Sequence, residues 1–336
     1  EGAPGAVLSC GWTVENPEKG STAITLSPGL SLVVVRNLSI RSHCFGIRAL
    51  ASKEAPRAHL VFEGISVDHV RHAFYLSDCD DVSVLDSTAK RYSKHGFRFE
   101  RGCDRVTLKN CLADCSEGDP VWETKTEVFP FGFIVNDGGE PNTSFLFQDC
   151  VARNNIKSNQ TVKYTNGDGF VAEGNNSGLH FVRCRAFRNQ DGGFDIKVDK
   201  TRFTDCIAMG HRRDFRVWRN AILKNCFAGG SQTGLWVKGG AVAVEGCTFL
   251  AHKKSAVEID DDSSPAVALT RCLVVSGETD YTLSIGKLER KDSCIVAKTV
   301  AEAGLASSDL AWDGAGASMD SAKFPDKGFS STRISR

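Results

Sequence analysis

Three aspartates and one arginine stand at matching places in successive stretches of the sequence. Asp168 and Asp191 each precede a glycine, whereas Asp195 and Arg216 each directly follow a phenylalanine. Carboxylates gathered at one point repel one another unless a cation lies between them, and hard oxygen ligands suit Ca²⁺. We therefore expect Asp168, Asp191 and Asp195 to bind one Ca²⁺, with Arg216 beside it. The alternative, in which the first two are turn residues and Asp195 only pairs with Arg216, stays open.

Basic and aromatic side chains are frequent in the same part of the sequence. The residues expected to bind substrate are Lys197, Arg213, Arg219 and Trp236. The cations would pair with acidic groups of a sugar chain, and the tryptophan would stack on a sugar ring. This composition predicts an electropositive groove that fits a polyanionic chain laid across the repeats, although a solvated charged face would have the same composition.

The elements that must position these residues form an internal repeat. Seven cysteines occupy one slot of it, and they are Cys111, Cys150, Cys184, Cys206, Cys226, Cys247 and Cys272, at intervals of 20 to 39 residues. A short strand pattern, often Gly-Phe, precedes each slot, and no segment has the period of an amphipathic helix. Strand repeats of ~20 to 25 residues stack as coils of a parallel β-helix, so we expect the cysteines to form an internal ladder.

The repeat predicts an all-β, single-domain, right-handed parallel β-helix (solenoid) of about ten coils. Residues 1–299 would form this catalytic domain with its N-terminal cap, and residues 300–336 would form a C-terminal cap and tail. Two intervals are too long for a bare coil. We therefore expect residues 114–131 and 154–167 to form loops along a binding face.

Charge and hydropathy restrict the partners of the chain. The sequence has 41 Lys and Arg against 41 Asp and Glu, so its formal net charge is zero. Nucleic-acid binding needs clustered excess basic charge, and no such partner is expected. No apolar run approaches the ~20 residues that cross a bilayer, so no membrane span is expected. The chain is expected to be a secreted monomer, extracellular or periplasmic.

Three phrases on successive repeats resemble polysaccharide lyase family nine, the calcium-dependent pectate lyases. The phrases are Asn166-Gly167-Asp168-Gly169-Phe170, Asn189-Gln190-Asp191-Gly192-Gly193-Phe194-Asp195 and Asp214-Phe215-Arg216. The resemblance implies a right-handed parallel β-helix in which Asp168, Asp191 and Asp195 bind Ca²⁺. Gly192 stands where that family has its fourth aspartate, and Arg216 stands where it has a lysine as Brønsted base.

The resemblance further implies β-elimination from a pectate-like polymer that contains uronate. A base removes the C5 proton, the bond from C4 to the glycosidic oxygen breaks, and a bound cation stabilises the charge that builds on the carboxylate. Arg216 is the expected base, as arginine is in other β-helix pectate lyases. If Arg216 only binds the carboxylate, Lys238 or Lys197 is the next candidate, because lysine loses its proton more readily than arginine.

Two other functions stay open at this stage. A β-helix glycoside hydrolase would use Asp191 and Asp195 as its acid and base. A non-catalytic cell-surface solenoid, such as an adhesin, would use the acidic cluster as a structural ion site.

Overall fold

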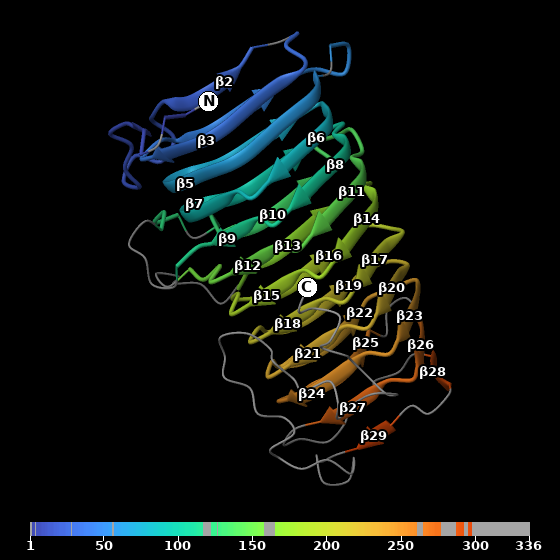
Figure 1. Ribbon diagram of the computed structural model, residues 1–336. Coiled ribbons are helices and arrows are strands. Elements are labelled where there is room, and N and C mark those ends of the chain that lie inside the picture. The colour runs from blue at the N-terminus through green and yellow to red at the C-terminus, as the bar shows by residue number, and fades with distance from the viewer. Residues whose placement is uncertain are drawn as a thin grey trace.

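The computed structural model describes residues 2–3, 5–27, 29–55, 57–116, 122–125, 127–157, 165–260, 265–276, 287–291 and 295–297. These residues form 29 β-strands and no helix, and every pairing between the strands is parallel. The strands stand in three columns, which are the three faces of one parallel β-solenoid of about ten coils (Figure 1). The expected all-β solenoid is thus confirmed. Within the described residues, no helix is long and apolar enough to cross a membrane.

Each face is a parallel sheet built from one strand of every coil. Face 1 contains β2 (Thr22–Leu26), β4 (Phe45–Leu50), β10 (Phe131–Asn136), β13 (Asp168–Glu173), β16 (Gly192–Ile196), β19 (Arg213–Val217), β22 (Thr233–Val237) and β25 (Ser255–Ile259). Face 2 contains β6 (Cys79–Leu85), β8 (Asp104–Lys109), β11 (Thr143–Gln148), β14 (Ser177–Val182), β17 (Thr201–Thr204), β20 (Ala221–Lys224), β23 (Ala241–Glu245), β26 (Ala266–Thr270) and β28 (Lys287–Lys291).

Face 3 follows the cysteine slot in each coil. It contains β1 (Val7–Ser9), β9 (Leu112–Asp114), β12 (Val151–Arg153), β15 (Arg185–Phe187), β18 (Ile207–Met209), β21 (Phe227–Gly229), β24 (Thr248–His252), β27 (Leu273–Ser276) and β29 (Ile295–Ala297). Three long strands bend from face to face in the N-terminal coils, and they are β3 (Val33–Arg41), β5 (Arg57–Ser77) and β7 (Thr88–Glu100).

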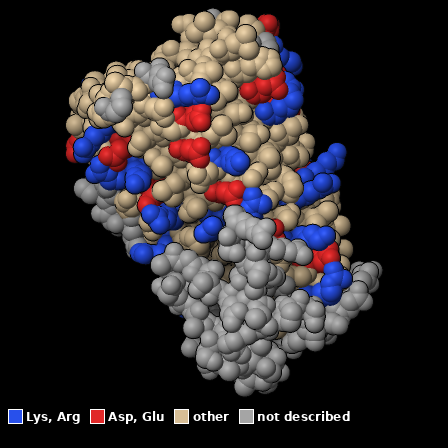
Figure 2. Space-filling model, viewed as in Figure 1, with Lys and Arg blue, Asp and Glu red and all other residues tan. Residues whose placement is uncertain are grey.

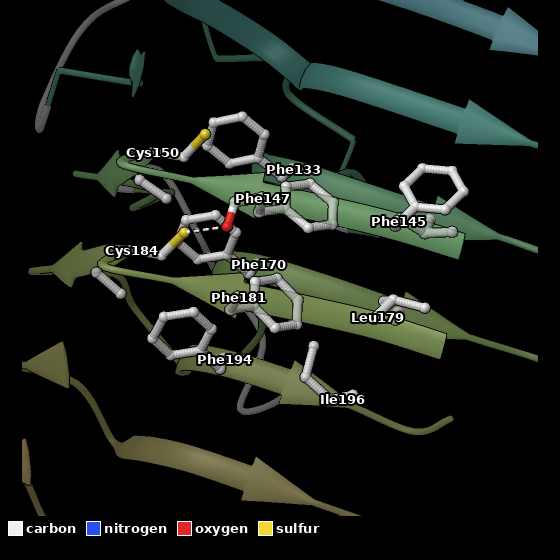
Figure 3. Close-up of a cluster of buried hydrophobic side chains, with 14 of the residues drawn as sticks. Phe133, Phe145, Phe147, Cys150, Phe170, Leu179, Phe181, Cys184, Phe194 and Ile196 are labelled. Atoms are coloured by element: carbon white, nitrogen blue, oxygen red, sulfur yellow. Dashed lines mark hydrogen bonds between the residues drawn. The ribbon is translucent and has the colours of Figure 1, made fainter. Parts of the chain in front are cut away.

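The interior is a set of side-chain ladders along the solenoid axis. Phe133, Phe170, Phe194 and Phe215 lie in register on successive strands of face 1, and their rings stack with centroids 4.7 to 5.0 Å apart. Figure 3 shows part of this column facing the phenylalanines of face 2. Inward alternation on parallel strands puts equal residues above one another, so a sequence repeat becomes a continuous core.

The predicted cysteine ladder is confirmed. All seven cysteines of the slot are at most 1% exposed and precede strands of face 3, which pair in order from β9 to β27. Their thiols donate to main-chain carbonyls, as Cys184 Sγ does to Phe147 O at 3.3 Å (Figure 3). The twelve described cysteines are all free, so this core is held by packing and thiol hydrogen bonds.

The two predicted loops lie beside face 1. One connects β9 to β10, the other connects β12 to β13, and Lys157 Nζ of the second donates to Val128 O of the first at 2.8 Å. Residues 117–121, 126 and 158–164 of these loops lie outside the described residues, as does the predicted C-terminal cap and tail, 300–336.

Candidate functional site

The outward side chains of face 1 form rows that the strand register fixes. Asp195 of β16 pairs with Val171 on one neighbouring strand and with Arg216 of β19 on the other, and Arg216 in turn pairs with Trp236 of β22. Asp168 begins β13, one coil before Asp195. Parallel strands lie about 4.8 Å apart, so this register gathers residues that are 20 or more positions apart in sequence.

Arg216 is the centre of the cluster. Its Nη1 lies 3.2 Å from Asp195 Oδ2 and 3.4 Å from Asp191 Oδ2, so these two carboxylate oxygens are no more than 6.6 Å apart. Lys197 Nζ lies 3.4 Å from Asp195 Oδ2, and Arg212 Nη1 lies 3.4 Å from Asp191 Oδ1. We call Asp168, Asp191, Asp195 and Arg216 the aspartate–arginine site.

Charge is layered in this site. The side chains of Asp191 and Asp195 are 6% and 3% exposed, whereas those of Arg216, Lys197 and Arg212 are 19%, 31% and 44% exposed. The negative groups therefore lie beneath and the positive groups lie at the surface. Figure 2 shows basic and acidic side chains close together over the visible face. The basic residues of the expected electropositive groove are paired with acids, as Lys197 and Arg216 are with Asp195 and Arg212 is with Asp191.

Burial and mutual repulsion set the protonation of the acids. Burial, and then the charges of Asp195 and Asp191, raise the pKa of Asp168 well above its ordinary value. Burial also raises the pKa of Asp195, against the opposing effect of Arg216 and Lys197. For Lys197, burial alone would lower the pKa, but Asp195 and Glu173 outweigh it and raise the pKa above the ordinary lysine value. Lys197 is therefore a bound cation here, poorly suited to be a base.

Two tryptophans enclose the central arginine. The Arg216 guanidinium lies 4.9 Å from the ring centroid of Trp218 and 5.2 Å from that of Trp236, and Arg213 lies 5.2 Å from the Trp236 centroid. Trp236 is 6% exposed, so it holds these two arginines and presents little surface to a sugar. Trp218 Nε1 donates to Asp195 Oδ1 at 2.9 Å.

Two predicted residues lie at the margin of the site. Lys238 follows β22, and its Nζ lies 3.2 Å from Asp260 Oδ1 on the next coil. Arg219 is exposed, and its charge contributes to lowering the pKa of Asp199. The structure thus gathers Asp191, Asp195 and the other predicted basic and aromatic residues around Arg216, and it places Lys238 and Arg219 outside that group.

Sequence reasoning missed how two members of the cluster act. The sequence allows Trp218 either to stack on a sugar ring or to pack within the fold, and in the structure it contacts Asp195 and Arg216. Arg212, one of the basic residues expected near this face, supplies the most exposed charge at Asp191. Both residues flank the Asp214-Phe215-Arg216 phrase. Spacing places both residues near the site, but their contacts with Asp195 and Asp191 depend on side-chain direction, which spacing does not give.

The donor set shows how far the site suits calcium. Asp168 Oδ1 accepts a hydrogen bond from the Gly192 main-chain N at 2.5 Å, and a Cβ placed on Gly192 would lie 2.6 Å from that oxygen. There is thus no room here for the fourth aspartate of the resembled family. The described part of the chain holds no group of three or more His, Cys, Asp or Glu arranged to bind a metal. Calcium binding stays a prediction, and no chemical step is derived through it.

Comparison with known proteins supports the architecture. No family model matches the sequence, and no curated protein matches it. Among solved structures, the chain is similar to a periplasmic alginate epimerase, AlgG, with a TM-score of 0.50, 10% identity, and coverage of 80% of this chain and 79% of that chain.

Two further similarities are weaker. The surface adhesin PfbA of Streptococcus pneumoniae has a TM-score of 0.36 and 10% identity, covering 79% of this chain and 82% of that chain. The catalytic unit of an α-1,3-glucanase from Streptomyces thermodiastaticus has a TM-score of 0.32 and 10% identity, covering 89% and 70%. Scores this low support no argument about the chain. The resemblance to polysaccharide lyase family nine is thus confirmed only in its coarser part, the parallel β-solenoid fold.

Proposed function

We propose that the chain is an enzyme that acts outside the cytoplasm on an acidic polysaccharide, at the aspartate–arginine site. The observation that carries this proposal is the layering of charge, because a sugar carboxylate that approaches face 1 meets Arg212, Lys197 and Arg216 before it meets any aspartate. The alginate epimerase gives a precedent for an enzyme of this fold that is named for a uronate polymer.

The reaction we propose is β-elimination. Arg216 is paired with two buried carboxylates, so it acts as a fixed cation that binds the uronate carboxylate. This pairing argues against the role of base that the resemblance implied for Arg216. Lys238, the next lysine that the resemblance offered, lies at the margin of the site with its Nζ 3.2 Å from Asp260 Oδ1, and it would have to leave that carboxylate to act as the base. It would take the C5 proton, the electron pair would form the C4–C5 double bond, and the departing O4 would take up a proton.

A substrate panel tests the proposal. The wild-type protein is incubated with pectate, rhamnogalacturonan, alginate and glucuronan, and the unsaturated uronate product is followed by its ultraviolet absorbance. Arg216→Ala should lower kcat/KM on the order of 100-fold, chiefly through KM, because it removes a charge-assisted contact to the carboxylate. Arg219→Ala is the control, since Arg219 is exposed on the same coil.

The same assay tests whether calcium takes part in the reaction. Activity that a chelator abolishes and calcium restores would support the expected metal role of Asp168, Asp191 and Asp195. A complete lack of unsaturated product on all four polymers contradicts the lyase proposal.

Glycoside hydrolysis is a second candidate, and the acids themselves favour it. Asp191 Oδ2 and Asp195 Oδ2 lie within 6.6 Å of each other, and burial with the charges of Asp195 and Asp191 raises the pKa of Asp168, which favours the protonated form that a general acid needs. Hydrolases need two carboxylates whose pKa values are pushed apart. A hydrolase would release reducing ends without unsaturated uronate.

A further inference from the structure

A groove lies on the outer surface of face 2, in the C-terminal coils. It has a volume of about 470 Å³, and it crosses the neighbouring strands β17, β20, β23 and β26. Figure 1 shows these strands in one column, beside the column of face 1 that holds the aspartate–arginine site. The groove is therefore on a different face of the solenoid from that site.

Small apolar side chains form the floor of this groove. They are Ile222, Ala241, Ala243, Ala266 and Ala268. Ile222, Ala243 and Ala268 are in register on successive strands, so they form one row along the solenoid axis. Ile222 is 45% exposed, and Ala241, Ala243 and Ala266 are exposed as well. The floor is thus both apolar and open to a ligand.

Face 2 has a different surface in the coils before the groove. Arg105 of β8 pairs with Asp81 at 2.5 Å, and Arg183 pairs with Asp149 at 2.7 Å. Ion pairs of this kind neutralise their own charge and hold their side chains over the sheet. The apolar floor is therefore a local feature of the C-terminal coils.

One end of the groove is basic. Lys200 and Arg202 line it where β17 begins, and both are exposed, as is the neighbouring Asn220. None of the described residues that line the groove is acidic. Farther along the strands, Lys224 and Glu245 lie 3.5 Å apart and offset each other. The groove is therefore complementary to an anion that also has an apolar surface.

The strand pairing argues against a peptide as this anion. Each strand of the floor is hydrogen-bonded to a strand on either side, from β14 to β28. The floor thus has no free edge to which a peptide could add a strand. A peptide that lay across it would leave main-chain N–H and C=O groups against alanine methyl groups, without hydrogen-bond partners.

A sugar chain suits the same surface. Its C–H faces are apolar, whereas its hydroxyls and carboxylates project from the edges of the rings. Parallel strands are about 4.8 Å apart, which is close to the length that one sugar unit adds to an extended chain. A second copy of the protein suits it less, because the floor measures roughly 20 Å by 10 Å and a stable interface buries about 800 Å² of each partner.

We propose that this groove is a second binding site, for an acidic polysaccharide that lies along the solenoid axis. Its carboxylates would pair with Lys200 and Arg202, and the apolar faces of its rings would pack on Ile222 and Ala243. The site holds the polymer without changing any of its bonds, so it does not rest on the proposed reaction. A chain held on face 2 raises the local concentration of the polymer at face 1.

Methyl NMR of alanine-labelled protein tests the groove directly. A tetramer of galacturonate is added to the wild-type protein, and the methyl signals of Ala243 and Ala268 are followed. Both signals should shift to a saturating value, whereas that of Ala152, which is buried in the interior, should not move. The methyl ester of the tetramer has the same rings without the charge, and it should leave all three signals in place.

Variants of the basic end test the charge. The double variant Lys200→Asn/Arg202→Gln should weaken binding, measured from the Ala243 and Ala268 shifts, at least about tenfold, because it removes two charge-assisted contacts. Asparagine is chosen for Lys200 because this residue has a φ of 55°, which asparagine tolerates. Arg105→Gln is the matched control, since it removes an exposed arginine from the same face outside the groove. It should leave the affinity unchanged.

Four results would overturn the proposal. The groove signals could stay in place, the methyl ester could shift them equally, the double variant could bind as tightly as the wild type, or polyglutamate could bind as tightly as the sugar. Signals that move with protein concentration alone would instead identify a second copy as the occupant. Saturable shifts without cleavage of any polymer would keep this site and contradict the proposed function, and cleavage without shifts would do the reverse.

Discussion

The two polar clusters of face 1 share one sheet and differ in how charge is neutralised. In the aspartate–arginine site, Lys197, Arg212, Arg213 and Arg216 each have a carboxylate oxygen within 4.0 Å. The second cluster, which we call the imidazole–lysine cluster, consists of His72, Lys94, His95 and Arg98. Its neighbouring acids pair with arginines, and Lys94 has no carboxylate oxygen within 4.0 Å among the described residues. A cation with a buried carboxylate partner is a binding group, whereas a cation pressed against other cations is a potential base.

An aromatic ring supports the central arginine in both clusters. Arg98 lies 4.9 Å from the Tyr75 ring centroid, and Arg216 lies at the same distance from that of Trp218. The hydroxyl of Tyr75 donates to Glu100, and the indole of Trp218 donates to Asp195. Each ring therefore orients both members of an ion pair. Both clusters have an arginine beside an aromatic ring that also hydrogen-bonds the acidic partner of that arginine. They differ mainly in the lysine, because Lys197 pairs with Asp195 and Lys94 has no such partner among the described residues.

Removing the central cation from each cluster should give the largest contrast. Arg216→Ala removes the shared partner of Asp191 and Asp195 but leaves Lys197 beside Asp195 and Arg212 beside Asp191, so it should lower the free energy of unfolding by about 1–3 kcal/mol. Lys94→Gln removes a side chain that has no ion pair within the part of the chain that the structure describes, and it should lower that free energy by no more than about 0.5 kcal/mol. Urea unfolding at pH 7 measures both. An equal loss of unfolding free energy in the two variants would show that Arg216 and Lys94 are stabilised by ion pairs of similar strength.

Acid should destabilise the protein through the imidazole–lysine cluster. The unfolded chain takes up protons at the ordinary histidine pKa near 6.5, whereas folded His72 and His95 stay neutral to much lower pH. Stability is therefore complete above pH 6.5 and falls as pH decreases below it, by at most about 1.4 kcal/mol per pH unit for each ring. The double variant His72→Gln/His95→Gln should show a shallower decline in urea unfolding between pH 7 and 5.

The exposed histidine His59 supplies the control for this pH effect. His59→Asn should leave the pH dependence of unfolding as it is in the wild type. A double variant as acid-sensitive as the wild type would locate the titration elsewhere, for example in His211 and His252, whose pKa values burial lowers to about 4.

The sequence was sufficient for the fold because the repeat carries its own register. Once Cys184 and Cys206 are recognised as one slot, parallel stacking leaves a single way to align the strands between them, and Phe194 must lie between Phe170 and Phe215. The same register predicts that Asp195 and Arg216 are neighbours. The register predicts the position of a residue along and across the face, and the structure confirms it for the row of Val171, Asp195, Arg216 and Trp236.

The chemistry of the sites was less predictable from the sequence, because the strand register does not determine where each side chain points or how deeply it is buried. Asp168 lies at the start of β13, three residues before the outward row, and its carboxylate accepts a hydrogen bond from the Gly192 main chain. Lys94 and the histidine pair carry no motif, and they lie where the strand register shifts and where Arg71 of β5 contacts Glu123 of the loop between β9 and β10. Long-range contacts of this kind leave no local pattern that spacing can reveal.

Rising pH should destabilise the protein through Asp168 of the aspartate–arginine site, whereas falling pH should destabilise it through the buried histidines. Burial and the two neighbouring aspartates raise the folded pKa of Asp168 above its unfolded value, so its contribution to stability is complete below about pH 4 and is lost as pH rises. Asp168→Asn keeps an acceptor for the Gly192 N–H and removes the titration. The variant should gain stability over the wild type with increasing pH, by at most about 1.4 kcal/mol per unit. A difference that is constant from pH 4 to 8 would mean that Asp168 is already ionised in the folded protein.

The smallest expected effect concerns the aromatic supports. Trp218→Phe keeps a ring beneath Arg216 and removes the hydrogen bond to Asp195, a carboxylate whose pKa that bond helps to lower. The free energy of unfolding should fall by about 1–2 kcal/mol, and the pKa of Asp195, measured by carboxyl carbon NMR, should rise.

Tyr75→Phe is the counterpart in the other cluster, because it likewise keeps the ring beside Arg98 and removes the hydrogen bond to Glu100. Since Glu100 still has both Nε and Nη2 of Arg98 as donors, at 3.1 and 2.7 Å, the loss there should be smaller than for Asp195. If Tyr75→Phe lowers the free energy of unfolding more than Trp218→Phe does, the Tyr75 hydroxyl rather than Arg98 is the main partner of Glu100.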